Sequence, residues 1–265
     1  MAQPTYIHGT GSEEQERLAL LNRLTNQSFI EFLDLTDPRS ILEIGSGLGI
    51  LAAEVAAHHP KTDVWGIESA TQQLEIAKKQ LRPNLHFVQA DAHHPPFGTA
   101  QFDVVYCRYI LEHVADPVRV LNEAHRVLKT GGKLHVQENN IFVLELYPDC
   151  LRFDHVWRQF VTLQAQLGGD GEIGKKLFSL LKAAGFQHIE LSIAPEIHWV
   201  GMPTFRPWVE NLIGNVRSGA EALRQKQLAT AEEITTALEE LRAFSERTDA
   251  SMYFYWNRAV GVKAE

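Results

Sequence analysis

Short apolar runs alternate with helical patterns between residues 40 and 137. The runs are too short for buried helices and are apolar throughout, so they predict strands that are covered on both faces. Strands are predicted at residues 40–44, 64–67, 85–89, 102–107 and 133–137. Helical patterns lie between them, at 50–57, 71–79 and 117–128. This alternation predicts βαβ units and a parallel sheet.

The pattern changes on both sides of this segment. Before it, apolar residues at helical spacing predict a helix over residues 12–34, with Ser12 as its N-cap and Gln15 completing a capping box. After it, helices are predicted at 149–168, 173–184 and most of 203–247, and strands at 188–193 and 252–262. No Pro- or Gly-rich linker separates these parts, so one domain is expected.

The expected domain spans residues 1–265 and has a core with additions around it. In an open α/β sheet the site lies at the carboxyl ends of the strands, where added helices can cover it. The parts are an N-terminal helical cover at 1–39, a core at 40–145, helical inserts forming a lid at 146–172 and 203–247, and a closing helix and hairpin at 173–202 and 248–265.

Composition excludes several classes of protein. The 265 residues include 25 Lys+Arg and 33 Asp+Glu, a formal charge of −8, which disfavours nonspecific nucleic-acid binding because phosphates require clustered basic residues. Two cysteines are too few for a disulfide framework or a cysteine zinc site. The N-terminal stretch has no apolar signal core, and no apolar run is long enough to cross a membrane. We expect a soluble, cytoplasmic protein with no nucleic-acid or membrane partner.

The strongest chemical motif follows the first predicted strand. Residues 41–49 contain Glu43 and then a G-x-G-x-G turn that opens a helix. Such turns let the backbone approach a nucleotide-like cofactor closely. A dinucleotide fingerprint requires G-x-G-x-x-G/A, which Ile50 breaks. Glu68 ends the second strand, where a carboxylate can accept hydrogen bonds from ribose hydroxyls, and Asp91 ends the third, within reach of an adenine amino group.

These segments together resemble the class I S-adenosylmethionine-dependent methyltransferases. The matching stretches are ILEIGSGLG, the acid Glu68, QADAHHPPF, FDVVYCRYILEHVADP and LKTGGKL, in the family's order over residues 40–137. The resemblance implies a Rossmann-like, doubly wound, seven-stranded α/β sheet of order 3-2-1-4-5-7-6, with the last strand antiparallel and a helical cover. It also implies S-adenosyl-L-methionine as the cofactor.

The resemblance also implies which residues hold the cofactor. Glu68 would bind the ribose with Ser69 beside it, and Asp91 with Ala92 would hold the adenine. Arg17, in a leading helix like that of some small-molecule methyltransferases, would meet the cofactor carboxylate. The remaining expected contacts are Glu43, Gly45, Ser46, Gly47, Arg108 and Tyr109. Glu43 has a second interpretation, in which it only fixes the glycine loop.

Methyl transfer from a sulfonium is an in-line displacement, so the protein supplies mainly position and desolvation. A base is needed only where the acceptor must lose a proton. His113 is the first candidate base, with Glu138 and Tyr6 behind it, although His113 could equally pack or cap and Glu138 could cap the following segment. The pairs His58–His59 and His93–His94 have no carboxylates at metal-ligand spacing, so no metal site is predicted.

The function favoured by these features is methyl transfer to a nitrogen or oxygen of a small-molecule acceptor. A lid with many aromatic residues suits a small, partly apolar acceptor and would exclude a folded macromolecule. Two alternatives remain open, an S-adenosylmethionine-binding protein without transferase activity and a protein methyltransferase. Charged residues in 203–247 indicate a solvated helix face or the contact of a homodimer.

Overall fold

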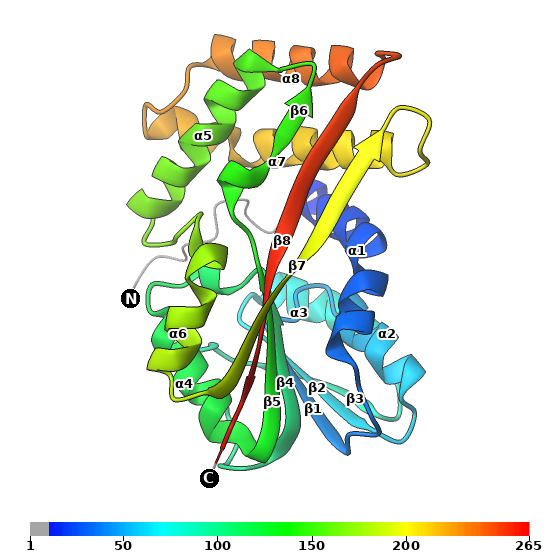
Figure 1. The fold of residues 1–265 in the computed structure, drawn as a ribbon, viewed down its shortest axis with the longest axis vertical. Coiled ribbons are helices and arrows are strands. Elements are labelled where there is room, and N and C mark those ends of the chain that lie inside the picture. Colours follow the sequence, from blue (N-terminus) through cyan, green and yellow to red (C-terminus); the bar gives the residue numbers. More distant parts are fainter. Residues whose placement is uncertain (1–10, 265) are drawn as a thin grey trace.

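A mixed sheet runs through the whole molecule, as the computed structural model of residues 11–264 shows (Figure 1). Its strands are β1 (Ser40–Ile44), β2 (Asp63–Glu68), β3 (Leu85–Gln89), β4 (Phe102–Arg108), β5 (Leu128–Glu138), β6 (Glu145–Tyr147), β7 (Gln187–Trp199) and β8 (Ser251–Val262). The sheet order is β3-β2-β1-β4-β5-β8-β6, and β7 pairs with β8. Strands β1 to β5 are parallel, and β8 is antiparallel to β5. The predicted fold is therefore confirmed, with β7 and β8 as the sixth and seventh strands of the expected order.

Helices cover the parallel part of the sheet on both faces. The helices are α1 (Ser12–Leu33), α2 (Ile50–His58), α3 (Thr71–Ala77), α4 (Pro117–Val127), α5 (Leu151–Gln166), α6 (Leu177–Ala183), α7 (Phe205–Gln225) and α8 (Ala231–Ser245), with 3₁₀ turns η1 (Lys78–Gln80), η2 (Leu111–His113), η3 (Ile141–Val143) and η4 (Ile173–Lys176). One core joins α1 and α2 to β1, β2 and β4, around Phe29 and Tyr106. A second joins α4 and α6 to the opposite face, around Val105 and Leu134. Burial of these apolar strands on both faces is what parallel pairing requires.

Strand β8 links this core to a second layer of helices. The half of β8 from Asn257 to Val262 pairs with β5, while its first residues, Ser251–Tyr253, pair with β6. Strand β7 follows the other edge of β8 along its length. The upper half of this ribbon packs on α5, α7 and α8, where Phe160, Trp208 and Phe244 are buried (Figure 1).

Three local predictions were wrong. Ser12 is the first residue of α1 rather than its N-cap; Gly11 occupies the cap position and makes no side-chain bond. The segment predicted as a helical insert at 146–172 begins inside strand β6, because the edge of β8 offers Tyr147 and its neighbours a pairing partner. Strand β7 extends well beyond 188–193, to Trp199, because its whole length pairs with β8.

Candidate active site

A cavity of about 780 Å³ lies at the carboxyl ends of β1, β2 and β4. Its floor is the glycine loop after β1, the end of β2, the loop after β3 and the turn after β4. Residues of α1, α5, α7 and β8 close it from the other side. Its volume lies within the range of small-molecule sites, and its position is that expected for an open α/β sheet.

The glycine loop is fixed to β2 and leaves space above itself. The backbone N–H groups of Gly45 and Ser46 both donate to the Ile67 carbonyl at 2.9 Å. Gly45 has φ of +73°, and a Cβ there would lie 2.1 Å from Cδ1 of Ile110, so a side chain does not fit. At Gly47 (φ +52°) a Cβ would have the Gln73 side-chain oxygen as its nearest neighbour, 3.7 Å away. A ligand can therefore approach the Gly47 backbone closely.

Two carboxylates line the cavity beside this loop: Glu68, which ends β2, and Asp91, in the loop after β3. Glu68 is only 7% exposed, and its carboxylate accepts hydrogen bonds from the Gly47 N–H at 2.9 Å and the Ala70 N–H at 2.7 Å. Asp91 accepts from the backbone and ring nitrogens of His93 through the single oxygen Oδ1. Partial burial raises the pKa of Asp91, but the bonds from His93 outweigh it and leave that pKa below its usual value. Both carboxylates are thus oriented by the protein at the cavity wall.

A buried acid, Glu43, and a half-buried cation, Arg108, line the cavity together. Burial raises the pKa of Glu43 to about 8, although the Arg108 guanidinium lowers it, while the nearby Glu68 adds to the rise. Arg108 donates hydrogen bonds to three side chains of α1: Thr25, Asn22 and Asn26. The guanidinium therefore ties α1 to the end of β4 and places a fixed positive charge beside the cavity.

His113 lies in η2, in the turn that follows β4, and lines the cavity. Its side chain is 14% exposed, and its Nε2 lies 3.7 Å from a carboxylate oxygen of Glu112. Burial lowers the pKa of His113 below the usual 6.5, and the neighbouring Arg17 lowers it further, while Glu112 and Glu14 oppose both effects. The imidazole is therefore neutral at pH 7 and can accept a proton.

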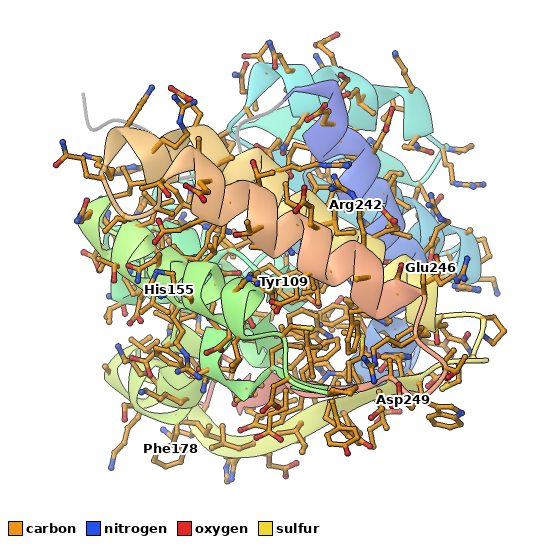
Figure 2. All side chains as sticks on the ribbon, turned by 90° about the horizontal axis from the view of Figure 1, so that it is seen from above. Tyr109, His155, Phe178, Arg242, Glu246 and Asp249 are labelled. Atoms are coloured by element: carbon orange, nitrogen blue, oxygen red, sulfur yellow. The ribbon has the colours of Figure 1, made fainter. Side chains whose placement is uncertain are left out.

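The far side of the cavity is mainly aromatic. The Tyr109 ring lies 4.7 Å from that of Trp256, and Figure 2 shows Tyr109 in the interior, below α5 and α8. By contrast, the labelled His155, Arg242 and Glu246 lie on the exterior of these helices. Four further aromatic residues complete this wall: Trp157, Phe160, Trp208 and Phe254.

Three amide side chains, those of Asn211, Asn215 and Gln164, interrupt the aromatic wall, and none of them was predicted from the sequence. Asn211 and Asn215 are one turn apart on α7, on the face that also carries Trp208. Gln164 of α5 donates to Glu112 at 3.1 Å and lines the same space. Polar residues inside the apolar stripe of α7 are a signal that sequence could have provided.

The structure brings most of the predicted site residues to one cavity. Those that line it are Arg17, Glu43, Gly45, Ser46, Gly47, Glu68, Ser69, Asp91, Ala92, Arg108, Tyr109 and His113. Arg17 is already engaged there, because Nε and Nη2 of its guanidinium donate to the Glu14 carboxylate at 2.7 and 2.6 Å. Tyr6 lies outside the described residues.

Glu138 is the predicted site residue that the structure does not bring to the cavity. It is 0% exposed, and its Oε1 accepts from the backbone N–H groups of Ile110 and Leu111 at 3.0 and 2.8 Å. Burial, with the Glu112 charge adding to it, raises the pKa of Glu138 well above its usual value. Glu138 therefore holds the turn that carries His113, instead of facing an acceptor.

Comparison with known proteins identifies the framework around this cavity. Residues 42–136, which build β1 to most of β5, match the family model described as a methyltransferase domain. This match and the relatives below support a class I S-adenosylmethionine-dependent methyltransferase.

Individual relatives of this chain are distant. It is 30% identical over 141 residues to demethylmenaquinone methyltransferase of Thermotoga maritima, covering 50% of this chain and 58% of that protein. It is 28% identical over 196 residues to an O-methyltransferase of Pyrenophora dematioidea, covering 70% and 69%. The chain spans only 46–60% of the length of three such curated relatives.

Among solved structures, phosphoethanolamine N-methyltransferase 2 of Haemonchus contortus, in complex with phosphomonomethylethanolamine and S-adenosylhomocysteine, has the same fold. The TM-score is 0.56 at 19% sequence identity, and the match covers 95% of this chain and 53% of that one.

The family's cofactor, S-adenosyl-L-methionine, fits the residues of the cavity. Glu68 presents a fixed carboxylate that suits a pair of ribose hydroxyls, and the open backbone at Gly47 admits close approach. Within residues 11–264, no group of three or more His, Cys, Asp or Glu side chains is placed to hold a metal ion. No helix in that range is both long and apolar enough to cross a membrane.

Proposed function

We propose that this methyltransferase transfers a methyl group to a nitrogen or oxygen of a small, largely apolar acceptor. The observation that carries the proposal is the continuity of the cavity, which runs from the glycine loop at Gly47 to the aromatic wall around Trp208 and Trp256. Helices α1, α5 and α7 cover that wall, so a folded protein or nucleic acid has no room at the reacting end.

The residues of the β1, β2 and β3 ends bind the cofactor in this proposal. Glu68 holds the ribose hydroxyls, and Asp91 with Ala92 holds the adenine. When bound, S-adenosyl-L-methionine supplies a methyl group that is already activated as a sulfonium. The buried carboxylate of Glu43 also lines the cavity, near the cation Arg108, and would favour a positively charged ligand there.

His113 serves as the proton acceptor. It lies at the cavity on the turn after β4, and its lowered pKa keeps the imidazole neutral at pH 7. Glu112, 3.7 Å away, would stabilise the imidazolium that forms when the acceptor loses its proton. The base is needed for a hydroxyl or an ammonium group, both of which carry a proton that must leave.

The amide groups of the wall favour a neutral polar head on an apolar body. Asn211 and Asn215 can each donate and accept hydrogen bonds, so they suit a carbonyl or hydroxyl group. The relative named O-methyltransferase supports oxygen as the acceptor atom, and the structure of the N-methyltransferase supports nitrogen. A quinone-type ring is a second candidate acceptor. The similarity to the Thermotoga demethylmenaquinone methyltransferase supports it.

The test is a transfer assay with S-adenosylmethionine labelled in its methyl group. The acceptors would be amines, phenols, hydroxylated aromatics and quinols, and the products would be analysed by mass spectrometry. The proposal predicts label in a small product with the wild type, and a large loss with Glu68→Ala. Tight cofactor binding without any product would favour the cofactor-binding protein, and label in protein would favour a protein methyltransferase.

A further inference from the structure

One face of the ribbon formed by β6, β8 and β7 is apolar and exposed. We call it the outer face, and its members are 45–64% exposed. They are Tyr147, Leu191, Ile193, Ile197, Trp199 and Tyr253. The register places them side by side: Trp199 and Tyr147 flank Ser251, and Ile197 lies opposite Tyr253. Directly opposite residues of an antiparallel pair point to the same face, so these side chains form one patch.

The two faces of β7 have the reverse of the usual polarity. A strand with one solvated face carries its polar residues outward. The alternate positions that point inward, against α7, include Glu196 and His198, which bond each other at 3.0 Å. The His198 ring lies 5.6 Å from that of Trp208. The outward positions carry Leu, Ile and Trp instead, which indicates that the outer face has a partner of its own.

No element within residues 11–264 covers this face. In Figure 1, β7 and β8 cross the front of the molecule, and α5, α7 and α8 lie behind them. In Figure 2, the view from above, the same strands form the lower margin, with the three helices on one side of them only. Among the strands of the described chain, β7 pairs with β8 alone, so its other edge is open.

We infer that a second copy of this chain covers the outer face and makes the protein a homodimer. The six side chains expose on the order of 700 Å², close to the roughly 800 Å² that each partner contributes to a standard interface. The six are aromatic or aliphatic, as at the centre of such an interface, and the exposed Glu145, which lies opposite Tyr253 on the edge strand β6, provides a polar rim. A two-fold pairing of identical patches also closes on itself, so the contact ends at two copies.

Charge argues against a lipid surface as the partner. Strands β6 and β7 contain Glu145, Glu190 and Glu196 but neither Lys nor Arg. The single basic residue of β8, Arg258, is buried and donates to Gln137. An anionic membrane attracts surfaces rich in Lys and Arg, so a self-complementary apolar contact fits the observations better.

The test measures the mass of the full chain in solution by sedimentation equilibrium and light scattering. The wild type should give twice the 29.9 kDa of one chain. Ile193→Glu would bury a carboxylate at the contact and should raise the dimer dissociation constant by at least about a hundredfold. Leu81→Glu is the matched control, because Leu81 is also 54% exposed but lies beside β3, at the opposite end of the sheet. The control should remain dimeric.

Each of the other outcomes overturns the inference. A wild type that stays monomeric at all attainable concentrations contradicts it, and so does a dimer that persists equally in Ile193→Glu and Leu81→Glu. A monomer that floats with vesicles of phosphatidylcholine and phosphatidylglycerol would assign the face to a membrane instead. Circular dichroism of both variants checks that the fold is kept, and Ile197→Ser provides a milder variant if Ile193→Glu does not fold.

Discussion

Two buried carboxylates beside the glycine loop are held in opposite ways. Glu68 receives hydrogen bonds from two backbone N–H groups, which compensate for its loss of water. Burial dominates at Glu43 and raises its pKa to about 8, in spite of Arg108 nearby. The first arrangement presents a fixed hydrogen-bond acceptor to a ligand. The second keeps Glu43 largely neutral, and a further positive charge bound beside it would favour its ionised form.

Removing the Glu68 carboxylate should weaken cofactor binding. A hydrogen bond to a charged group contributes about 1.5–3 kcal/mol, so Glu68→Ala should reduce affinity for S-adenosylmethionine at least about tenfold. Titration calorimetry measures this, and Glu75→Ala, an exposed acid on α3, is the control. Unchanged affinity in Glu68→Ala would remove this residue from the proposed cofactor site.

Replacing Glu43 should change how stability depends on pH. The folded pKa of about 8 lies above the usual 4.5, so the contribution of Glu43 to stability is complete below pH 4.5 and is lost as pH rises through 8. Glu43→Gln removes that loss. The variant should therefore gain on the order of a few kcal/mol over the wild type at pH 8.5, and little at pH 5. Urea unfolding of the variant and the wild type at both pH values measures this gain in the free energy of unfolding. The same gain at pH 8.5 and at pH 5 would contradict a raised pKa for Glu43.

His113 should set the acidic limb of the pH profile. Burial lowers its pKa below 6.5, so the base form predominates at pH 7 and is lost as pH falls further. For an acceptor that the transfer assay identifies, kcat/KM of the wild type should stay level near pH 7 and fall only at more acidic pH, below the usual histidine pKa of 6.5. His113→Gln should lower kcat about 10²–10⁴-fold, leave cofactor affinity near that of the wild type, and abolish this limb. Equal losses of turnover and cofactor affinity would indicate a structural role.

The turn after β4 depends on one side chain of the neighbouring strand. Glu138, at the end of β5, accepts from two successive backbone N–H groups, those of Ile110 and Leu111. The Leu111 N–H is buried and the Ile110 N–H is partly buried, so little water can replace that oxygen. This support places His113 and Tyr109 at the cavity, and Tyr109 itself has φ of +59°, a conformation that costs free energy unless its surroundings fix it.

Two substitutions of Glu138 should separate its hydrogen bonds from its charge. Glu138→Gln keeps an oxygen acceptor and should cost less than about 1 kcal/mol, because burial already favours the neutral form of this acid. Glu138→Ala leaves two buried N–H groups unpaired and should lower the free energy of unfolding by about 2–4 kcal/mol. Denaturant unfolding measures both, and equal effects would show that the charge matters instead.

Elements were predictable where the pattern was local. The apolar strands β1, β2 and β4 and the turn at Gly45–Gly49 depend on neighbouring residues, and the sequence predicted them with nearly the observed bounds. Strand β6 was not predictable, because its three residues become a strand only by pairing with Ser251–Tyr253, over a hundred residues later. For the same reason the length of β7 follows from β8 and not from its own pattern.

The site residues likewise differ in how far the sequence alone could predict them. Glu68 ends β2 and Asp91 follows the end of β3, and the carboxyl ends of parallel strands meet at one edge, so their presence at one cavity was predictable. The burial of Glu138 was not, because it depends on where the turn at Ile110 folds back. The roles of Asn211 and Gln164 depend on how α5 and α7 dock over the sheet, which a single sequence does not determine.

The molecule as a whole consists of a Rossmann-like parallel sheet and a layer of helices α5, α7 and α8, and strand β8 joins the two. This strand pairs with β5 in one half and carries Phe254 and Trp256 into the cavity in the other. The ribbon of β6, β7 and β8 therefore connects the sheet, the aromatic wall of the cavity and the outer face. A cavity with a polar, glycine-lined end and an aromatic end follows directly from that arrangement.

A crystal structure with S-adenosylhomocysteine tests the central claim most directly. We predict the ribose hydroxyls within hydrogen-bond distance of the Glu68 carboxylate, the adenine beside Asp91, and the sulfur facing the space between His113 and the aromatic wall. A nucleoside bound elsewhere, or with its sulfur directed away from His113 and Trp256, would contradict the account.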